Sequence, residues 1–234
     1  MRRHTRPTCT STSHQNAYED NAIAIMKLLT LALLLATSTL AQPTAAVQLT
    51  AANIIAIGPS TASCAGSVAP SECRTAIQAA PWLAFSFSNF GHSAFSTQAA
   101  LLSLILYETG NFTYSVNHYP GVPGQGTRNM QSPAFNLLYA KWLSESCTNC
   151  RLSAAQVANA EGASVEAVLD LVNGDEFGFG SAAWFLATQC TADVRAALAT
   201  GTTEGWEAYM GCVGAEAGGE RRAIWESIIA LEHW

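Results

Sequence analysis

The sequence has few charged residues, and basic residues are the scarcer kind. Asp, Glu, Lys and Arg make up 12% of the 234 residues, and 11 Lys and Arg stand against 17 Asp and Glu. Binding to nucleic acid depends on clustered basic side chains that neutralise phosphates. Because no basic patch is present and the formal net charge is −6, the composition excludes nucleic acid as a partner.

The N-terminal part lacks an apolar run long enough for a transmembrane helix, which needs about 20 residues. The run from Leu28 to Ala36 follows Lys27 and precedes small residues that end at Ala41. This is the layout of a secretory signal peptide over residues 26–41, with cleavage after Ala41. A transmembrane anchor is the alternative.

Residues 1–25 are polar and show no periodicity. A signal peptide begins its chain, so we expect that Met26 is the true start and that residues 1–25 are a mis-annotated extension. A disordered extension ahead of a signal anchor is the alternative. The sequence thus predicts a secreted, extracellular protein of residues 42–234, without stable membrane association.

The cysteine pattern lacks a second CxxC pair, and no HxxxH spacing occurs. A structural zinc site needs four such ligands, so we expect no metal and no other cofactor, although "CTNC" alone is also compatible with a redox motif. Loss of residues 1–41 removes Cys9 and leaves an even number of cysteines, which predicts three disulfides in a secreted chain. Spacing does not choose among the pairings. Local pairing is our hypothesis: Cys64–Cys73, Cys147–Cys150 and Cys190–Cys212.

The expected mature chain loses four bases and two acids and has a net charge of −8. Its apolar periodicity predicts one mainly α domain of seven or eight helices. Residues 53–57, "NIIAI", are the one stretch that suggests a strand, so we expect at most a small β element. The expected helices are 93–108 with Ser93 or Ser96 as N-cap, 132–146 with Ser132 as N-cap, 153–163 from Ser153, 164–173 from Ser164, an apolar central helix 180–190, 191–201 from Thr191, 203–214 and 218–234.

A long irregular segment, residues 110–131, separates two of these helices. It is rich in Gly, Pro, Asn and Tyr, and structureless loops of this length in a compact domain are usually functional. Asn111-Phe112-Thr113 is an N-glycosylation sequon, which predicts a glycan on Asn111.

The loop begins directly after Glu108, a carboxylate that ends an apolar helix. An acid is disfavoured at a helix C-terminus, and burial favours the protonated form of a carboxyl group. Such a group can donate a proton to a leaving oxygen, as glycoside cleavage requires. A helix-terminal acid that reaches solvent is the alternative.

Two short motifs resemble the lysozyme-like superfamily, especially goose-type lysozymes and lytic transglycosylases. The first is "ETGNF" (108–112) and the second is "GTRNMQ" (126–131). The apolar segment "FGFGSAAWFLATQC" (177–190) resembles the central helix of that superfamily, which includes plant-type chitinases. Residues 85–190 carry the resemblance, and the secreted, cysteine-paired layout resembles fungal muramidases.

The resemblance implies catalytic and sugar-binding residues. Glu108 becomes the general acid, and Asp175, in a glycine-flanked turn beside Glu176, is the preferred second carboxylate. The alternative for these two acids is a charge that complements a helix N-terminus. Candidate sugar contacts are Gln131, Met130, Asn129, Tyr114, Asn117, Tyr119 and Tyr139.

These expectations amount to a secreted glycoside hydrolase that acts as a monomer on a polysaccharide. The resemblance implies a lysozyme, or muramidase, that degrades bacterial cell-wall peptidoglycan and is antimicrobial. Chitin or chitosan is the alternative substrate. A non-catalytic carbohydrate-binding or host-interaction protein on the same scaffold is the alternative from another class.

Overall fold

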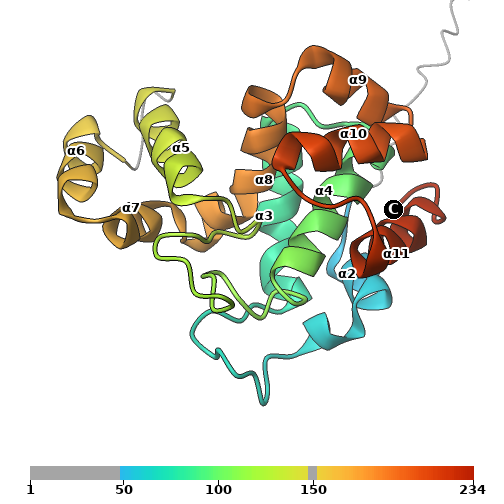
Figure 1. The fold of residues 1–234 in the computed structure, drawn as a ribbon. Coiled ribbons are helices and arrows are strands. Elements are labelled where there is room, and N and C mark those ends of the chain that lie inside the picture. Colours follow the sequence, from blue (N-terminus) through green and yellow to red (C-terminus); the bar gives the residue numbers. More distant parts are fainter. Residues whose placement is uncertain (1–47, 147–151) are drawn as a thin grey trace, which may run out of the picture. The chain divides into compact units, whose positions relative to one another are not determined.

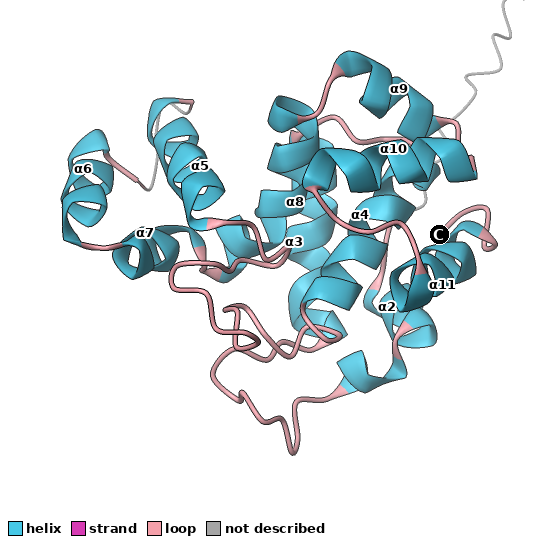
Figure 2. Ribbon diagram, viewed as in Figure 1, coloured by secondary structure: helices cyan, strands magenta, loops and turns pink. Residues whose placement is uncertain are grey.

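The computed structural model describes residues 48–146 and 152–234, and this part of the chain is mainly helical. Figure 2 shows helices joined by loops, with no strand among the described residues. Two isolated β-bridges, Val116–Gly126 and Gly126–Gln131, are its only extended pairings. The prediction of a mainly α, disulfide-stabilised domain is therefore confirmed.

The described part contains ten α-helices and one 3-10 helix. In chain order they are α2 (Ala51–Ile57), η1 (Pro59–Ala62), α3 (Ala76–Asn89), α4 (Phe95–Glu108), α5 (Pro133–Glu145), α6 (Ala154–Ala163), α7 (Val165–Val172), α8 (Asp175–Gln189), α9 (Ala192–Ala199), α10 (Thr203–Val213) and α11 (Gly219–Ile229).

Helices α4 and α8 form the centre of the described fold, together with α3 (Figure 1). Every residue of α4 from Ala99 to Leu106 is buried, and so is every residue of α8 from Gly178 to Leu186. A helix that is apolar all round is stable only when other elements cover it. Here α3 packs on α8, while α9 and α11 pack on α4. The predicted central position of the apolar 180–190 segment is confirmed.

The remaining helices form two groups on either side of this centre. Helices α5, α6 and α7 pack on one another and lie together at the left of Figure 1. Helices α9 and α10 pack on each other, and α11 packs on α4. The loop 110–131 leads from the end of α4, in the centre, to the start of α5, in the group formed by α5, α6 and α7.

Several predicted helix starts are confirmed by their capping contacts. The side chains of Ser153, Ser164 and Thr191 each accept a hydrogen bond from a backbone N–H in the first turn of the helix that follows. Ser132 is the N-cap of α5 with Pro133 at the first helical position. These signals are local, and so they are readable from sequence.

Two helices near the N-terminus were missed. Residues 53–57 lie in α2 and not in a strand, because Thr50 and Asn53 form a capping box that starts a helix despite the β-branched isoleucines. Helix α3 likewise begins with a capping box, formed by Thr75 and Gln78. The irregular apolar and aromatic composition of α3, together with its internal Pro81, concealed the helical period.

Three predicted boundaries were wrong, and one of them is the end of α11, which lies at Ile229 and not at residue 234. The N-cap of α4 is Ala94, which has no side-chain capping bond, so neither Ser93 nor Ser96 caps this helix. Helix α8 begins at Asp175, five residues before the predicted start. Asp175 and Glu176 therefore lie in the first helical turn and not in a turn that precedes the helix.

The described residues contain two of the three hypothesised disulfides. Cys64–Cys73 closes the segment that precedes α3, and Cys190–Cys212 ties the end of α8 to α10. Cys147 and Cys150 lie outside the described residues, as do Cys9, the extension 1–25 and the signal peptide 26–41. Those predictions stay predictions.

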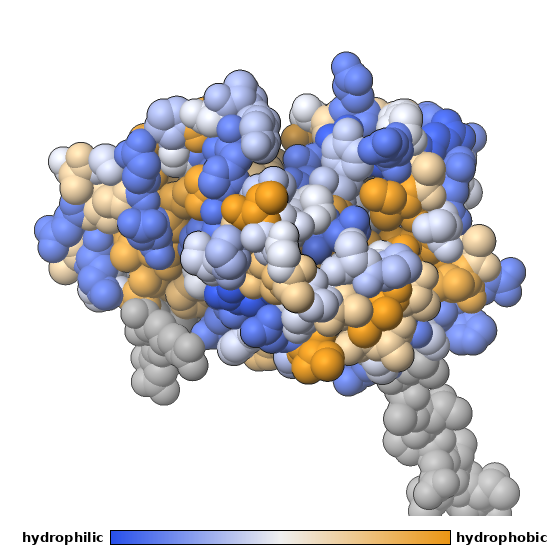
Figure 3. Space-filling view, turned by 90° about the horizontal axis from the view of Figure 1, so that it is seen from below, coloured by the Kyte–Doolittle hydropathy of each residue, from blue (hydrophilic) through white to orange (hydrophobic). Residues whose placement is uncertain are grey.

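The surface of the described part carries hydrophobic residues in small groups. Figure 3 shows orange, hydrophobic groups separated by blue and white residues on the face that it displays. In residues 48–146 and 152–234, no helix combines the length and the hydrophobicity that crossing a bilayer requires.

Candidate functional site

Glu108 ends α4 beside an arginine from the far end of the chain. Its Oε1 accepts a hydrogen bond from Nη2 of Arg221 at 2.7 Å, across a separation of 113 residues. The two side chains are 21% and 14% exposed, respectively. This ion pair joins the last turn of α4 to the first turn of α11.

Arg221 is held in place by more than the carboxylate. Its Nη1 donates to the carbonyl of Glu216 at 2.9 Å, and its guanidinium lies 4.1 Å from the ring centroid of Tyr107. Arg221 therefore sets a positive charge directly beside the Glu108 side chain. The sequence interpretation did not anticipate Arg221 as the partner of Glu108.

Glu108 lies between two cavities, which together we call the Glu108 cleft. The first has a volume of about 510 Å³, and the second has a volume of about 290 Å³. Tyr107, Glu108 and Met130 line both. A ligand larger than one cavity therefore meets the Glu108 carboxylate in its middle.

Most of the candidate contact residues line this cleft. Asn129, Met130 and Gln131 line the first cavity, with Arg221. Tyr114, Asn117, His118 and Tyr119 line the second. The loop 110–131 thus supplies residues to both cavities, as its length and composition suggested.

Some of these side chains are occupied by structural hydrogen bonds. Gln131 is 6% exposed and donates from Nε2 to Oδ1 of Asn136 at 2.8 Å. Asn117 accepts from the backbone N–H of Gly121 at 2.8 Å. These two residues shape the loop, and they also form walls of the cleft.

Tyr139 does not lie in the Glu108 cleft. It is 2% exposed, and its hydroxyl donates to the carbonyl of Phe177 at 3.2 Å. Burial, and secondarily the charge of Glu176, raises the pKa of the Tyr139 phenol. Its ring faces Trp142 and Trp184, in the packing between α5 and α8. Tyr139 lies on the buried face of α5. The sequence interpretation had assigned it to sugar binding and not to the core.

Asp175, the predicted second carboxylate, lines neither cavity of the cleft. Its two oxygens accept hydrogen bonds from Nε of Arg74 at 2.7 and 2.8 Å. As the first residue of α8 it also complements the positive end of that helix. The structure therefore favours the alternative interpretation, a helix N-terminal charge, over a catalytic role.

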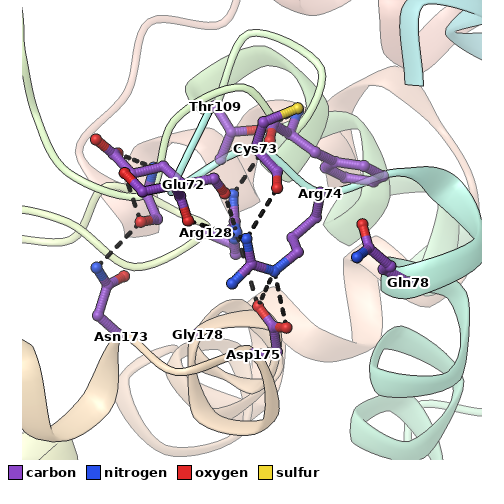
Figure 4. Close-up of polar contacts among 12 residues, drawn as sticks. Glu72, Cys73, Arg74, Gln78, Thr109, Arg128, Asn173, Asp175 and Gly178 are labelled. Carbon is purple, nitrogen blue, oxygen red and sulfur yellow. Dashed lines mark hydrogen bonds and ion pairs between the residues drawn. The ribbon is translucent and has the colours of Figure 1, made fainter. Parts of the chain in front are cut away.

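The Asp175 contact belongs to a partly buried set of charges that we call the Arg128 network, formed by Glu72, Arg74, Arg128 and Asp175. Figure 4 shows the guanidinium groups of Arg74 and Arg128 converging on Asp175. Arg128 is 1% exposed, and burial lowers its pKa to about 10. It therefore remains charged at neutral pH.

Arg128 binds the backbone at the start of the loop 110–131, where Tyr114 lines the second cavity. Its Nη1 donates to the carbonyls of Tyr114 at 3.0 Å and Phe112 at 3.3 Å. Its Nη2 donates to the carbonyl of Glu72 at 2.7 Å. This one side chain thus fastens the loop 110–131 to the disulfide-closed segment before α3.

Glu72 fastens the same loop from the other direction. Its Oε2 accepts from the backbone N–H groups of Ser115 at 2.7 Å and Val116 at 3.0 Å, and its Oε1 lies 2.7 Å from Nε2 of His118. Burial raises the pKa of the Glu72 carboxyl, but these hydrogen bonds together outweigh burial and lower it below 4.5. Sequence reasoning did not single out Glu72.

Glu72 is expected to make stability depend on pH in acid. Because its pKa is lowered in the folded state, its stabilising contribution is present above about pH 4.5 and is lost as pH falls through the folded-state pKa. We expect Glu72→Gln to melt lower than wild type near neutral pH, with the difference shrinking towards about pH 3. Thermal unfolding followed by circular dichroism measures this. Parallel melting curves at all pH values would contradict the linkage, and Glu207→Gln, at an exposed acid, is the matched control.

The loop also stores backbone strain around the cleft. Asn111, Phe112, Thr127 and Met130 have φ values from +50° to +66°, a region that non-glycine residues rarely occupy. Such residues persist only where surrounding structure enforces them, and they concentrate at functional sites. Their position on both flanks of Glu108 supports a binding role for this cleft.

The predicted glycosylation residue, Asn111, is partly buried. Its Oδ1 lies 2.9 Å from the point that a Cβ at position 58 would occupy, so Gly58 leaves room for this side chain. Glycosylation of Asn111 stays a prediction.

The described ranges, 48–146 and 152–234, contain no group of three or more His, Cys, Asp or Glu side chains arranged to hold a metal ion. The prediction that the chain uses no cofactor stays a prediction.

Comparison with known proteins finds one relationship. No protein-family model matches the chain, and no solved structure matches it. The chain is 42% identical over 143 residues to a bifunctional dioxygenase (DOX)-epoxy alcohol synthase (EAS) of Fusarium oxysporum strain Fo5176. The match covers 59% of this chain and 11% of that protein. The chain therefore corresponds to a small part of a much longer relative.

This relationship contradicts the predicted function. The relative is named for a dioxygenase and an epoxy alcohol synthase, neither of which cleaves glycosidic bonds. The interpretation as a muramidase, with its chitin-cleaving and carbohydrate-binding alternatives, was therefore wrong. The more general prediction, that the chain is an enzyme, keeps its support because the relative is an enzyme. The lysozyme-like resemblance, which rested on short motifs, gains no support from the comparisons.

Proposed function

We propose that the chain is an enzyme module whose active site is the Glu108 cleft, and that it acts on a small oxygen-bearing molecule of the epoxy alcohol class. The observation that carries this proposal is the Glu108–Arg221 pair, which presents a carboxylate between two cavities. The substrate class is suggested by the name of the relative, one of whose activities is an epoxy alcohol synthase.

The arrangement suits a base-assisted opening of an epoxide by water. Glu108, paired with Arg221, accepts a proton from a water molecule. The water oxygen forms a bond to an epoxide carbon as the carbon–oxygen bond of the ring breaks. The ring oxygen then takes a proton, and Glu108 returns its proton to solvent, so that epoxide plus water gives a vicinal diol.

Tyr107 is positioned to assist this step. It lines both cavities, is 38% exposed, and its hydroxyl makes no hydrogen bond within the described residues. A phenol can donate a hydrogen bond to the ring oxygen as negative charge develops there. Arg221 over its ring favours the orientation in which Tyr107 and Glu108 face the same cleft.

The test uses the full chain and a simple probe, an epoxyhexanol in isotopically labelled water. Wild type is expected to form labelled hexanetriol, detected by mass spectrometry. We expect Glu108→Gln to reduce the rate at least about 100-fold, because the amide does not accept the proton. Glu207→Gln, an exposed acid paired with Arg222, is the control and is expected to retain the wild-type rate.

Three outcomes would overturn the proposal: no conversion by wild type, equal rates for wild type and Glu108→Gln, or binding of the probe without conversion. The last outcome would leave the cleft as a ligand-binding site without catalysis. Circular dichroism of Glu108→Gln shows whether any loss reflects unfolding, since Arg221 loses its carboxylate partner in this variant. We also propose that the chain is secreted, which its two described disulfides support.

A further inference from the structure

A separate cavity lies at the N-terminal end of α4, at the opposite end of that helix from Glu108. Its volume is about 390 Å³, and it is lined by the loop 90–94, by Thr97 of α4, by the end of α8 and by Arg195 of α9. None of its lining residues is acidic.

Arg195 brings a positive charge to this cavity without a carboxylate to balance it. Within residues 48–146 and 152–234, every other Lys and Arg has an acidic side chain within 4.0 Å. Arg195 donates only from Nη1, to the carbonyls of Ala187 at 3.2 Å and of Cys190. Its remaining N–H groups make no hydrogen bond in that part of the chain, so they are available to a ligand.

The first turn of α4 adds unpaired N–H groups. Its N-cap, Ala94, has no side chain able to accept a hydrogen bond, and Phe95 begins the helix uncapped. A helix N-terminus carries partial positive charge and free N–H groups that favour an anion. Ala94 and Thr97 both line the cavity, so this end of the helix borders it.

Two polar side chains, each more than nine-tenths buried, point to a ligand independently of the helix. Thr97 is 6% exposed, and its hydroxyl has no hydrogen-bond partner among the described residues. His92 is 8% exposed and donates from Nε2 to the carbonyl of Ala183 at 3.0 Å, which leaves Nδ1 without a partner there. Both residues line the cavity, and neither of these two atoms is among the fully enclosed unpaired side-chain atoms of the described residues, so both remain accessible to a ligand.

We propose that this cavity binds the anionic group of a small molecule, a carboxylate or a tetrahedral oxyanion. Arg195 supplies the charge, and the Thr97 hydroxyl and the first N–H groups of α4 supply hydrogen bonds. The cavity exceeds the size of a bare ion, so the natural ligand carries further atoms beside the anionic group. This site is distinct from the Glu108 cleft and does not depend on the function proposed for it.

His92 makes binding depend on pH. Burial lowers the pKa of His92, and the charge of Arg195, the charged group that acts on it, lowers it further. A bound anion offsets the charge of Arg195 and favours the protonated imidazole, whose Nδ1–H then donates. We therefore expect anion binding to tighten as pH falls from about 8 to about 5.5.

Isothermal titration of the full chain with sodium sulfate and, separately, sodium acetate tests the site. The two probes distinguish a tetrahedral oxyanion from a planar carboxylate, and neither changes charge over most of this pH range. Arg195→Gln is expected to weaken binding of the preferred anion about ten-fold or more, because a charge-assisted hydrogen bond is lost. Thr97→Val, which preserves shape, is expected to weaken it about five-fold.

Thr61→Val is the matched control, since the equally buried hydroxyl of Thr61 already has an internal partner in the carbonyl of Gly58. It is expected to bind like wild type. Failure of wild type to bind either anion, or equal binding by wild type and Thr97→Val, would overturn the proposal. Arg195→Gln also loses a hydrogen bond to the end of α8 and can unfold for that reason. In that case the affinity of Thr97→Val for the anion tests the proposal.

Discussion

Arg128→Met is expected to lower the free energy of unfolding by about 3 to 5 kcal/mol, the cost of breaking a buried charged network. Arg128 is 1% exposed and donates to the carbonyls of Glu72, Phe112 and Tyr114. Methionine fills much of the same space but donates no hydrogen bond. Three carbonyls that are at least partly buried then lose a hydrogen-bond donor, and Asp175 loses a nearby positive charge.

Urea denaturation followed by tryptophan fluorescence measures this change. The matched control is Arg222→Met, at an exposed arginine that pairs with Glu207 and Glu226. Exposed ion pairs contribute little, so we expect a loss below about 1 kcal/mol. Equal losses in the two variants would show that the Arg128 network does not hold the loop as the contacts indicate.

Phe179→Ala is expected to cost about 3 to 5 kcal/mol as well, because it empties a site in the middle of α8. Phe179 is 0% exposed, and its ring meets that of Phe112 edge-on at 5.5 Å. The guanidinium of Arg128 lies 4.8 Å from its ring centroid. The same denaturation measurement applies, and Phe85→Ala, 54% exposed on α3, is the control, with an expected loss below about 1 kcal/mol.

The two changes are expected to be coupled. Arg128, Phe112 and Phe179 are in mutual contact, so the double variant Arg128→Met/Phe179→Ala should lose less than the sum of the single losses. Strict additivity would mean that Phe179 and Arg128 stabilise the loop independently. A second readout is the rate of epoxyhexanol conversion, which a loosened loop is expected to reduce.

Helical segments were readable from sequence where a local signal marked them. Ser153, Ser164 and Thr191 start helices through contacts with residues three positions away, and such contacts depend only on nearby sequence. The same kind of signal marks α2 and α3, through Thr50 and Thr75, but β-branched and aromatic composition obscured it. At these two helices the capping signal was a better guide than the helix propensity of the residues.

Glu108 was readable for a different reason. Acids are disfavoured at the C-terminus of a helix, and long irregular loops are uncommon in compact domains. Both exceptions occur at Glu108, and the structure places this residue in a cleft. Its partner was not readable. Arg221 lies 113 residues away, and no local pattern distinguishes it from the neighbouring Arg222, which pairs with other acids on the surface.

The motifs around Glu108 suggested a chemistry that the comparisons contradict. "ETGNF" and "GTRNMQ" correspond to a strained loop that builds a cleft, and a cleft of this kind suits many ligands. The structure resolves which side chains face the cleft. It separates Glu108, Asn129 and Tyr114 from Asp175 and Tyr139, which the motifs had grouped with them.

The sequence by itself determined the helical class and most of the helix starts, because each depends on residues close together along the chain. It suggested two of the disulfides and singled out Glu108, and the structure confirmed the disulfides and placed Glu108 in a cleft. The tertiary structure alone decided the partners: Arg221 for Glu108, Glu72 and Arg128 for the loop 110–131, and the position of Arg195 at a separate cavity. Those contacts join segments that only packing of α4, α8 and α11 brings together. Ion pairs between residues as far apart as Glu108 and Arg221 depend on the fold, and no local sequence pattern predicts them.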